Sequence, residues 1–326
     1  MPCARLLRIM SHDPWAPIHV ACVNNDPEAL SRELENGVSP NLKEGGYGSR
    51  PRAPLCLVLE HARNPDVTAS CVSLLLNAGA SVDDSISDST MGRMMPLQFA
   101  ALRSFTKVAV ALLEAGAEVD STYRGRTALH YAAGLTSNYS GLVGYRISNA
   151  LATRHEAATR ALLEAGAKVN AAEEDGGLTP LHFAAASGMY KVSRLLLAAG
   201  ASLDHVGRNE DFRDAPLAYA YRWAPWFKTD EDSRARCRRV MRTVPFLLRA
   251  GAALPVMPVR QHHSLSGSVP YDCPYINKVR WAGGFRAYEK QHLAALVALL
   301  APKFAHLVPT DVVPRIVSFW YPVGFW

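Results

Sequence analysis

Hydrophobic and small residues recur along the chain in two short phrases that alternate. The first phrase places Ala, Thr or Met before Pro or Ala, then Leu or Ile, and then Ala at close spacing. The second phrase is a Leu-rich stretch that ends in glycine and a small or aliphatic residue. Both phrases space their apolar residues as one face of a helix requires, so each pair of phrases predicts two short helices that pack together.

Six such pairs follow one another between residues 15 and 254. The first phrases cover residues 16–21, 53–58, 95–102, 127–134, 179–186 and 215–222, and the second phrases cover 34–41, 74–83, 112–120, 162–170, 195–204 and 246–254. The glycines of the second phrases are Gly37, Gly79, Gly116, Gly166, Gly200 and Gly251. A helix C-terminus favours a left-handed residue, which glycine adopts without steric cost, so each glycine predicts the end of a second helix. Short Val-Asp or Val-Asn stretches and polar residues then predict a turn or hairpin.

The spacing between the phrases is regular in the odd units and irregular in the even ones. The glycine follows the Leu or Ile of the first phrase by 19 positions in units one, three and five, whereas units two, four and six contain 5, 18 and 15 additional residues. We place these insertions between the two helices. In unit four we expect a polar loop between Gly134 and His155. In unit six we expect a basic helix with Arg234, Arg238 and Arg242 on one face and Val240, Met241, Val244 and Leu247 toward the core.

One phrase is complete enough to indicate a family. Thr179, Pro180, Leu181, His182 and Ala184 form a T-P-L-H-x-A phrase, and with it the chain resembles the ankyrin repeat family. The resemblance implies an all-α fold, a solenoid of helix-turn-helix units with hairpin loops, in which each unit is stabilised by its neighbours. It also implies that the repeated imidazoles of His19, His130 and His182 tie adjacent repeat loops together by hydrogen bonds.

The domain organisation follows from this reading. We expect an N-terminal segment at residues 1–14 and a repeat domain of about six units at residues 15–254. Residues 255–287 contain a Pro- and Ser-rich stretch and are interpreted as a linker. Residues 288–326 are interpreted as a short helical C-terminal module, with one helix around Tyr288 to Leu300 and a second from Asp311 to Trp320.

Composition limits the compartment and the class of partner. The chain has 326 residues, of which 49% are hydrophobic and 20% charged, which is enough apolar surface for a sizeable core. Its net charge of +6 is too small to make nucleic acid or anionic lipid the default partner. The six cysteines are widely spaced, and no stretch is typical of a signal peptide or a membrane span. We therefore expect an intracellular protein, cytoplasmic or nuclear, that is not secreted.

No stretch of the sequence indicates catalysis. The motifs of phosphate-binding loops, serine hydrolases, zinc proteases and EF-hands are absent. The adjacent pair His262 and His263 lacks a further ligand at metal-binding spacing, and its side chains diverge on any regular element. We expect no enzyme activity, no cofactor and no metal.

In the family, the hairpin tips and the first helices form a concave groove that binds a protein partner. Aligning the units places nine residues at such positions. These candidate partner-binding residues are Arg103, Arg124, Arg126, Asp175, Ser187, Phe212, Asp214, Arg222 and Trp223.

The end of the chain carries a second, shorter resemblance. Residues 307–320 resemble the opening phrase of an F-box, and ankyrin arrays that end in an F-box-like or SOCS-box-like module dock on cullin-type ubiquitin ligases. The resemblance implies Skp-type adaptor or cullin subunits as partners. The docking residues would be Leu307, Pro309, Val312, Val313, Ile316, Val317, Phe319 and Trp320.

Two other interpretations remain open. The C-terminal module can instead be a cap that covers the last repeat, since a repeat array needs its apolar end covered. The arginine face at residues 234–242 can instead bind nucleic acid or another anionic surface, which we consider the weaker reading.

Overall fold

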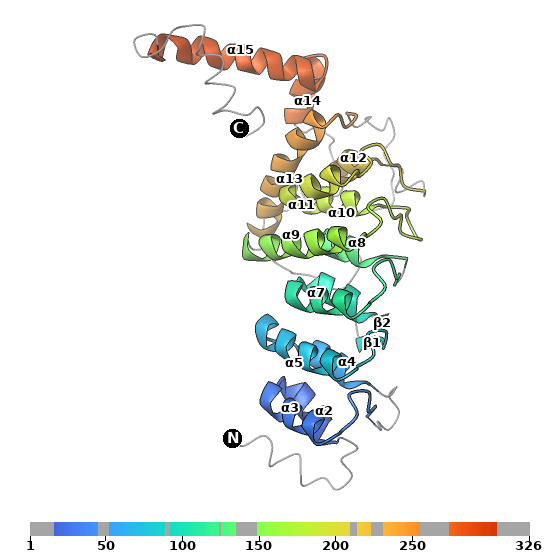
Figure 1. Ribbon diagram of the computed structural model, residues 1–326. Helices are drawn as coiled ribbons and strands as arrows, with labels where there is room; N and C mark the ends of the chain where they lie inside the picture. Colours follow the sequence, from blue (N-terminus) through green and yellow to red (C-terminus); the bar gives the residue numbers. More distant parts are fainter. Residues whose placement is uncertain are drawn as a thin grey trace. The chain divides into compact units, whose positions relative to one another are not determined.

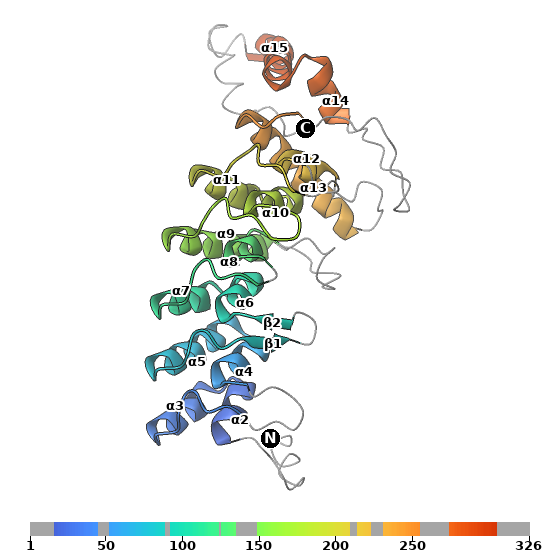
Figure 2. The ribbon, with the colours of Figure 1, turned by 90° about the vertical axis from the view of Figure 1, so that its right-hand side faces the viewer.

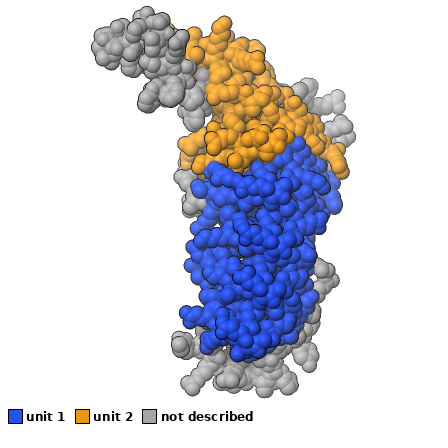
Figure 3. Space-filling model, in the orientation of Figure 1, with its two compact units in different colours: residues 1–175 blue, residues 176–326 orange. Residues whose placement is uncertain are grey.

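The computed structural model describes residues 16–44, 52–88, 92–123, 125–134, 149–208, 214–222, 231–254 and 274–304. The chain divides into two compact units, residues 1–175 and residues 176–326, which Figure 3 shows in different colours. Within each unit the helices come in pairs, as the repeated phrases predict (Figure 1).

The described residues of the first unit contain four helix pairs. The first helices are α2 (Pro17–Asn24), α4 (Pro54–Glu60), α6 (Pro96–Arg103) and α8 (Ala128–Ala132), and the second helices are α3 (Pro27–Glu35), α5 (Pro65–Asn77), α7 (Thr106–Glu114) and α9 (Asn149–Glu164). Each first helix packs against the next first helix, and each second helix against the next second helix, so the unit has two parallel rows of helices (Figure 2).

In the part of the second unit that the structure describes there are two further repeat pairs and a C-terminal pair. The helices are α10 (Pro180–Ser187), α11 (Tyr190–Ala198), α12 (Pro216–Arg222), α13 (Glu231–Arg249), α14 (Pro274–Trp281) and α15 (Phe285–Phe304). Here α10 packs on α12 and α11 packs on α13, while α15 contacts both α13 and α14.

The ends of the helices confirm how the phrases were interpreted. Proline occupies the first turn of α2, α4, α6 and α10, where its missing N–H leaves no helical hydrogen bond unmade. The glycines of the second phrases all have positive φ; these are Gly37, Gly79, Gly116, Gly166, Gly200 and Gly251. At Gly116, for example, φ is +89°, and the N–H groups of Gly116 and Ala117 donate to Leu113 and Leu112 as the helix ends.

The core lies where the phrases predict it. The Leu or Ile of every first phrase is at most 2% exposed; these residues are Ile18, Leu55, Leu97, Leu129, Leu181 and Leu217. Five leucines of the second phrases are completely buried, namely Leu75, Leu112, Leu162, Leu196 and Leu247. Because burying one such side chain stabilises a fold by roughly 1.5–3 kcal/mol, this repeated pattern explains why neighbouring units pack together.

The insertions of the even units lengthen the second helices, and in unit four this differs from the predicted loop. The second helices of the odd units have nine residues each, but α5 has 13, α9 has 16 and α13 has 19. Residues 149–154, expected to be loop, form the first turns of α9. The Ala-rich sequence from Asn149 explains this, since Ala has the highest helix propensity. The insertions thus lengthen the second helices as well as the connections before them.

One hairpin contains a regular pair of strands. The strands β1 (Ile86–Asp88) and β2 (Gly92–Met94) are antiparallel, with Ile86 opposite Met94. Both of these side chains are fully buried. The apolar ends of the strands therefore fix this hairpin against the helices, and β1 contacts α4.

The C-terminal region is helical over more of its length than expected. Helix α14 and the start of α15 lie within residues 255–287, the predicted linker, and the predicted helix around 288–300 falls inside α15. Helix α14 begins at Pro274 and buries Ile276 and Val279, a short apolar spacing that the preceding Pro-rich stretch obscured. Residues 305–326, with the predicted second helix and all the candidate docking residues at 307–320, lie outside the described residues.

Candidate protein-binding surface

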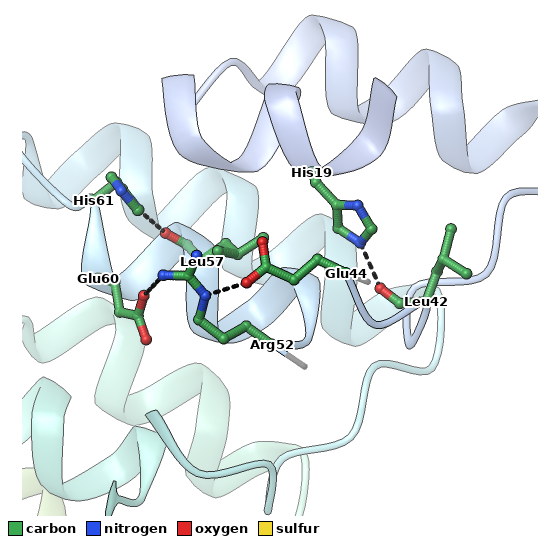
Figure 4. Close-up of polar contacts among 7 residues, drawn as sticks. All are labelled: His19, Leu42, Glu44, Arg52, Leu57, Glu60 and His61. Atoms are coloured by element: carbon green, nitrogen blue, oxygen red, sulfur yellow. Dashed lines mark hydrogen bonds and ion pairs between the residues drawn. The ribbon is translucent and has the colours of Figure 1, made fainter. Parts of the chain in front are cut away.

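A side chain on each of four first helices, α2, α4, α6 and α10, fixes the hairpin that follows it. In the first repeat, the backbone N–H of Ala16 donates to Nδ1 of His19 at 3.1 Å, and Nε2 of His19 lies 2.6 Å from the carbonyl oxygen of Leu42 (Figure 4). Because Nδ1 accepts, Nε2 carries the hydrogen and donates it. The imidazole therefore links the start of α2 to the hairpin 23 residues later.

The same arrangement recurs at the predicted histidines. Nδ1 of His182 accepts from the N–H of Thr179 at 3.0 Å, and Nε2 donates to the carbonyl of Asp214 at 2.9 Å. Nδ1 of His130 accepts from the N–H of Thr127 at 3.1 Å. His182 is fully buried, and burial lowers its pKa to about 4, so the ring is neutral near pH 7. His19 and His182 thus each link a first helix to the following hairpin, whereas the bonds described for His130 are those to Thr127.

Two repeats use other residues at this position, which sequence analysis missed. Nε2 of Gln98 donates to the carbonyl of Ser121 at 2.7 Å, and its Oε1 accepts from the N–H of Met95. Sγ of Cys56 donates to the carbonyl of Asp84 at 3.2 Å. The signal was their place in the phrase, immediately after the Leu that follows Pro. The position of Gln98 and Cys56 in the repeat, and not their residue type, identifies their role.

Two side chains, Asn41 and Asp120, connect their hairpins to the next ones. Oδ1 of Asn41 accepts from the N–H of Ser81 at 2.8 Å, and its Nδ2 donates to the carbonyl of Gly79 at 2.9 Å. Oδ1 of Asp120 accepts from the N–H of Lys168 at 2.9 Å. Asp120 ends a Val-Asp stretch, and Asn41, which follows Pro40, has the same place four residues after the glycine of its phrase. This explains why a side chain with an acceptor oxygen recurs there.

An ion-pair cluster closes the base of the first hairpin. The guanidinium of Arg52 pairs with Glu44 and with Glu60 at 2.9 Å, and the backbone N–H of Glu44 donates to the carbonyl of Arg52 at 3.1 Å (Figure 4). Hydrogen bonding to Glu44 raises the pKa of Arg52 further. At the C-terminal end of α4, Nδ1 of His61 lies 3.1 Å from the carbonyl of Leu57. The cluster holds the two sides of the hairpin together next to α4.

Arg126 was predicted to contact a partner, but the structure places it inside a buried ion pair. Its Nε donates to Oε2 of Glu173 at 2.5 Å, and the two side chains are 7% and 4% exposed. Burial raises the pKa of Glu173, and the nearby guanidinium opposes that effect. The pair links two successive hairpins of the first unit. The prediction was wrong because it treated every charge at a hairpin as solvent-facing, whereas the partner is 47 residues away.

Of the other candidates, Ser187 is also buried, at 1% exposure, and so cannot face a partner. Arg103 is half-buried at the end of α6, Asp175 is exposed on a hairpin, and Asp214 is half-buried. The side chain of Arg222, at the end of α12, lies outside the described part of the chain. So do three whole residues, Arg124, Phe212 and Trp223.

The arginine face of α13 is partly confirmed. Arg238 and Arg242 are exposed, while Val240, Val244 and Leu247 are buried; Met241 is half-buried, and the side chain of Arg234 is outside the described set.

Several exposed hairpin residues were not singled out from the sequence. Leu42 is 40% exposed although it is apolar, and Thr122 and Glu174 are exposed on the next hairpins of the same unit. In the second unit Val206 is 50% exposed. We call Leu42, Thr122 and Glu174 the hairpin face of the first unit. The carbonyl of Leu42 accepts a bond from His19, the carbonyl of Ser121 beside Thr122 accepts one from Gln98, and Glu173 beside Glu174 pairs with Arg126. The side chains of Leu42, Thr122 and Glu174 are exposed to solvent.

Three further observations concern metal ligands, membrane-spanning helices and the cysteine thiols. Within the described ranges, no three His, Cys, Asp or Glu side chains come together as a metal site would require. None of the helices described is both long and apolar enough to span a bilayer. Burial raises the pKa of the Cys22 and Cys56 thiols to about 12, so neither is a thiolate at neutral pH.

Comparison with known proteins agrees with this architecture. A family model for ankyrin repeats in many copies matches residues 147–197. A human protein, Ankyrin repeat and SOCS box protein 16, is 34% identical over 187 residues, which make up 57% of this chain and 36% of that protein. The chain thus matches little more than a third of that relative's length.

A solved ankyrin repeat domain shares the fold. The crystal structure of the human ASB11 ankyrin repeat domain aligns with a TM-score of 0.50 and 21% identity, over 75% of this chain and 88% of that one. The ankyrin repeat domain of Bcl-3, a member of the IkappaB family, aligns with a TM-score of 0.49 and 22% identity, over 74% and 89% of the two chains. The repeated phrases, the paired helices with their glycine ends and the hairpin-fixing side chains lead to the same conclusion as these matches: the fold is an ankyrin-repeat solenoid.

Proposed function

We propose that this chain is an interaction scaffold that binds a protein partner through its hairpins and first helices. The observation that carries the proposal is the contrast at the hairpins between a fixed backbone and exposed side chains. The carbonyl of Leu42 is held by His19, whereas its side chain is 40% exposed. A surface whose backbone is already ordered loses less conformational entropy on binding.

The hairpin bonds extend this argument along the first unit. Asn41 connects the first hairpin to the second, and Arg126 and Glu173 connect two later ones. These polar groups satisfy one another internally, so the exposed side chains beside them are left to contact a partner. Ankyrin-repeat proteins as a class are binding scaffolds rather than enzymes, which agrees with this role.

Affinity capture with a charge-matched pair of variants tests the proposal. The hairpin variant carries Leu42→Arg, Thr122→Arg and Glu174→Arg. The control carries Ser73→Arg, Asn77→Arg and Glu164→Arg on the second helices, where all three residues are exposed. Both variants gain the same charge. We expect the control to capture the same proteins as the unmodified chain from an extract of the native source, and the hairpin variant to lose them. Equal capture by all three chains would refute the proposal.

A second candidate function is recognition of substrates for a cullin-type ubiquitin ligase. The observation that favours it is the similarity to a human protein whose name includes a SOCS box, together with the F-box-like phrase at residues 307–320. In this reading the repeats would hold a substrate and the tail would bind Skp-type adaptor or cullin subunits.

Truncation separates this function from a capping role of the tail. A chain ending at Phe304 keeps every described helix. Loss of ligase subunits from the captured proteins, with an unchanged circular dichroism melt, would support the adaptor role. A lower melting temperature without ligase subunits in either sample would instead indicate a cap.

Capture of nucleic acid through α13 would be recognised by its steep dependence on salt and its loss on Arg238→Gln and Arg242→Gln substitution.

A further inference from the structure

Basic side chains gather where α5, α7 and α9 lie side by side in the first unit (Figure 1). Nζ of Lys107, at the start of α7, lies 2.8 Å from Oδ1 of Asp66, at the start of α5. Oγ1 of Thr106 donates to the carbonyl of Arg154 on α9 at 3.4 Å. The pKa of Asp66 is lowered by Lys107 and, to a smaller extent, by Arg154, so both cations act on the same carboxylate.

Arg103 adds a guanidinium that is held in place. Its guanidinium carbon lies 5.7 Å from the ring centre of Phe99 and 5.6 Å from that of Phe105. Its Nη2 donates to the carbonyl of Ala62 at 3.5 Å. Arg63, which follows Ala62 in the sequence, is exposed. Because cation–π contacts and a hydrogen bond restrict Arg103, less rotamer freedom is lost when it binds an anion.

These four cations, Arg63, Arg103, Lys107 and Arg154, form what we call the basic patch, in which the carboxylate of Asp66 pairs with Lys107 and is also influenced by Arg154. The next carboxylate along α9, Glu156, pairs with Arg160 one turn further on. The four cations and the carboxylate of Asp66 together carry three positive charges in excess. The side chains of Arg63, Lys107 and Arg154 are exposed. Such an excess on a fixed backbone attracts a complementary anionic group.

We propose that the basic patch binds an acidic segment of the protein partner, rich in Asp or Glu. This inference rests on the proposed scaffold function and names a second contact area, which lies at the end of α6, before α5 and on α7 and α9. The planar guanidinium of Arg103 matches a carboxylate with two parallel hydrogen bonds. The N-cap residue of α7, Phe105, offers no side-chain acceptor, so the positive end of that helix adds to the attraction.

The composition of the patch favours a short acidic peptide over nucleic acid. Proteins that bind duplex DNA neutralise about 6–10 phosphates in well-studied cases, whereas this patch has three excess charges. Asp66 lies among the cations and would repel a continuous phosphate backbone, but a peptide can place a hydrogen-bond donor or a small residue opposite it.

Fluorescence anisotropy with the full chain tests the assignment. The probes are a labelled glutamate-rich peptide, its glutamine counterpart and a labelled single-stranded oligonucleotide. The patch variant carries Lys107→Gln and Arg154→Gln. The matched control carries Arg32→Gln and Lys168→Gln, which removes the same charge from exposed positions elsewhere in the unit. Circular dichroism verifies that both are folded.

We expect the patch variant to weaken binding of the glutamate peptide at least about tenfold, which is about 1.4 kcal/mol. The control should change it by less than about twofold, since isolated surface charges contribute little. Arg103→Lys, which keeps the charge but loses the planar fork, should weaken binding as well. No binding of the glutamate peptide, equal loss in patch variant and control, or tighter binding of the oligonucleotide would each overturn the inference.

Affinity capture distinguishes this inference from the scaffold proposal itself. If the hairpin variant loses the captured proteins and the patch variant retains them all, the basic patch is not a contact area while the scaffold function stands. If both variants retain them, the scaffold proposal itself fails.

Discussion

Gln98 and His182 make the same two hydrogen bonds from the same position of their repeats. Each accepts from the N–H of the residue three positions earlier, at 3.2 and 3.0 Å, and each lies within 3 Å of a carbonyl of the following hairpin, at 2.7 and 2.9 Å. The position therefore requires an acceptor and a donor at a fixed separation. It does not require a charge.

The acid sensitivity of the second unit follows from this relationship. Burial lowers the pKa of His182 to about 4, below the value of 6.5 expected in the unfolded chain. Between these values the unfolded chain binds more protons, so the free energy of unfolding falls as the pH falls through this window, by about 3 kcal/mol at most. We predict that His182→Gln keeps the stability at neutral pH and removes this loss, as measured by urea unfolding across the window.

A second buried histidine, which the variant leaves unchanged, serves as the internal control for that experiment. His155 has its pKa lowered to about 4 by burial as well, and its Nδ1 lies 2.9 Å from the carbonyl of Ala132 in the first unit. His155 is unchanged in the variant and should keep its own contribution. If His182→Gln lost as much stability on acidification as the unmodified chain, the assignment of the effect to His182 would be wrong.

Close approach of helices predicts very different costs for two glycines. Gly188 has φ of +67°, and a Cβ built there would lie 2.5 Å from backbone atoms of Arg239 and Val240 on α13. Gly200 has φ of +90°, but a Cβ there would meet nothing within 4 Å. We predict that Gly200→Ala costs about 1–2 kcal/mol, from the left-handed conformation alone. Gly188→Ala should cost at least about 1–3 kcal/mol more, because α13 must shift. Thermal unfolding of both variants measures the difference, and equal costs would contradict the packing described.

The ion pair of Arg126 and Glu173 predicts strong coupling between hairpins. Removing one partner leaves a buried charge, so Arg126→Met and Glu173→Leu should each destabilise the fold by about 3–5 kcal/mol. The double variant should recover most of that loss, since neither charge then remains buried. A double-mutant cycle from chemical denaturation gives the coupling energy. Additive effects would show that the two side chains act independently.

The repeated part of the fold was predictable because it depends on local rules. The glycine at the end of each second helix and the leucine of each first phrase have the same backbone or packing requirement in every unit, so their repetition identified them. Gly116 and Leu181, for example, have the conformation and the burial that their positions predict.

The surface was less predictable because it depends on contacts between distant residues. Nothing in the local sequence distinguishes Arg126, buried against Glu173, from an exposed arginine at a hairpin. Cys56 was interpreted only as a cysteine, although its place in the repeat gives it the hydrogen-bonding task of His19. The grouping of Arg103, Lys107 and Arg154 arises from three different helices, which only the packing of the repeats brings together.

The scaffold function is tested most directly by hydrogen exchange on a complex with a captured protein. Amide exchange is compared between the full chain alone and the same chain bound to that protein. The account predicts slower exchange on binding in the hairpins around residues 39–44, 119–123 and 171–176, with little change along α3 and in the second half of α5. Protection confined to α14 and α15, with hairpin exchange unchanged, would contradict it and place the binding site on the C-terminal helices.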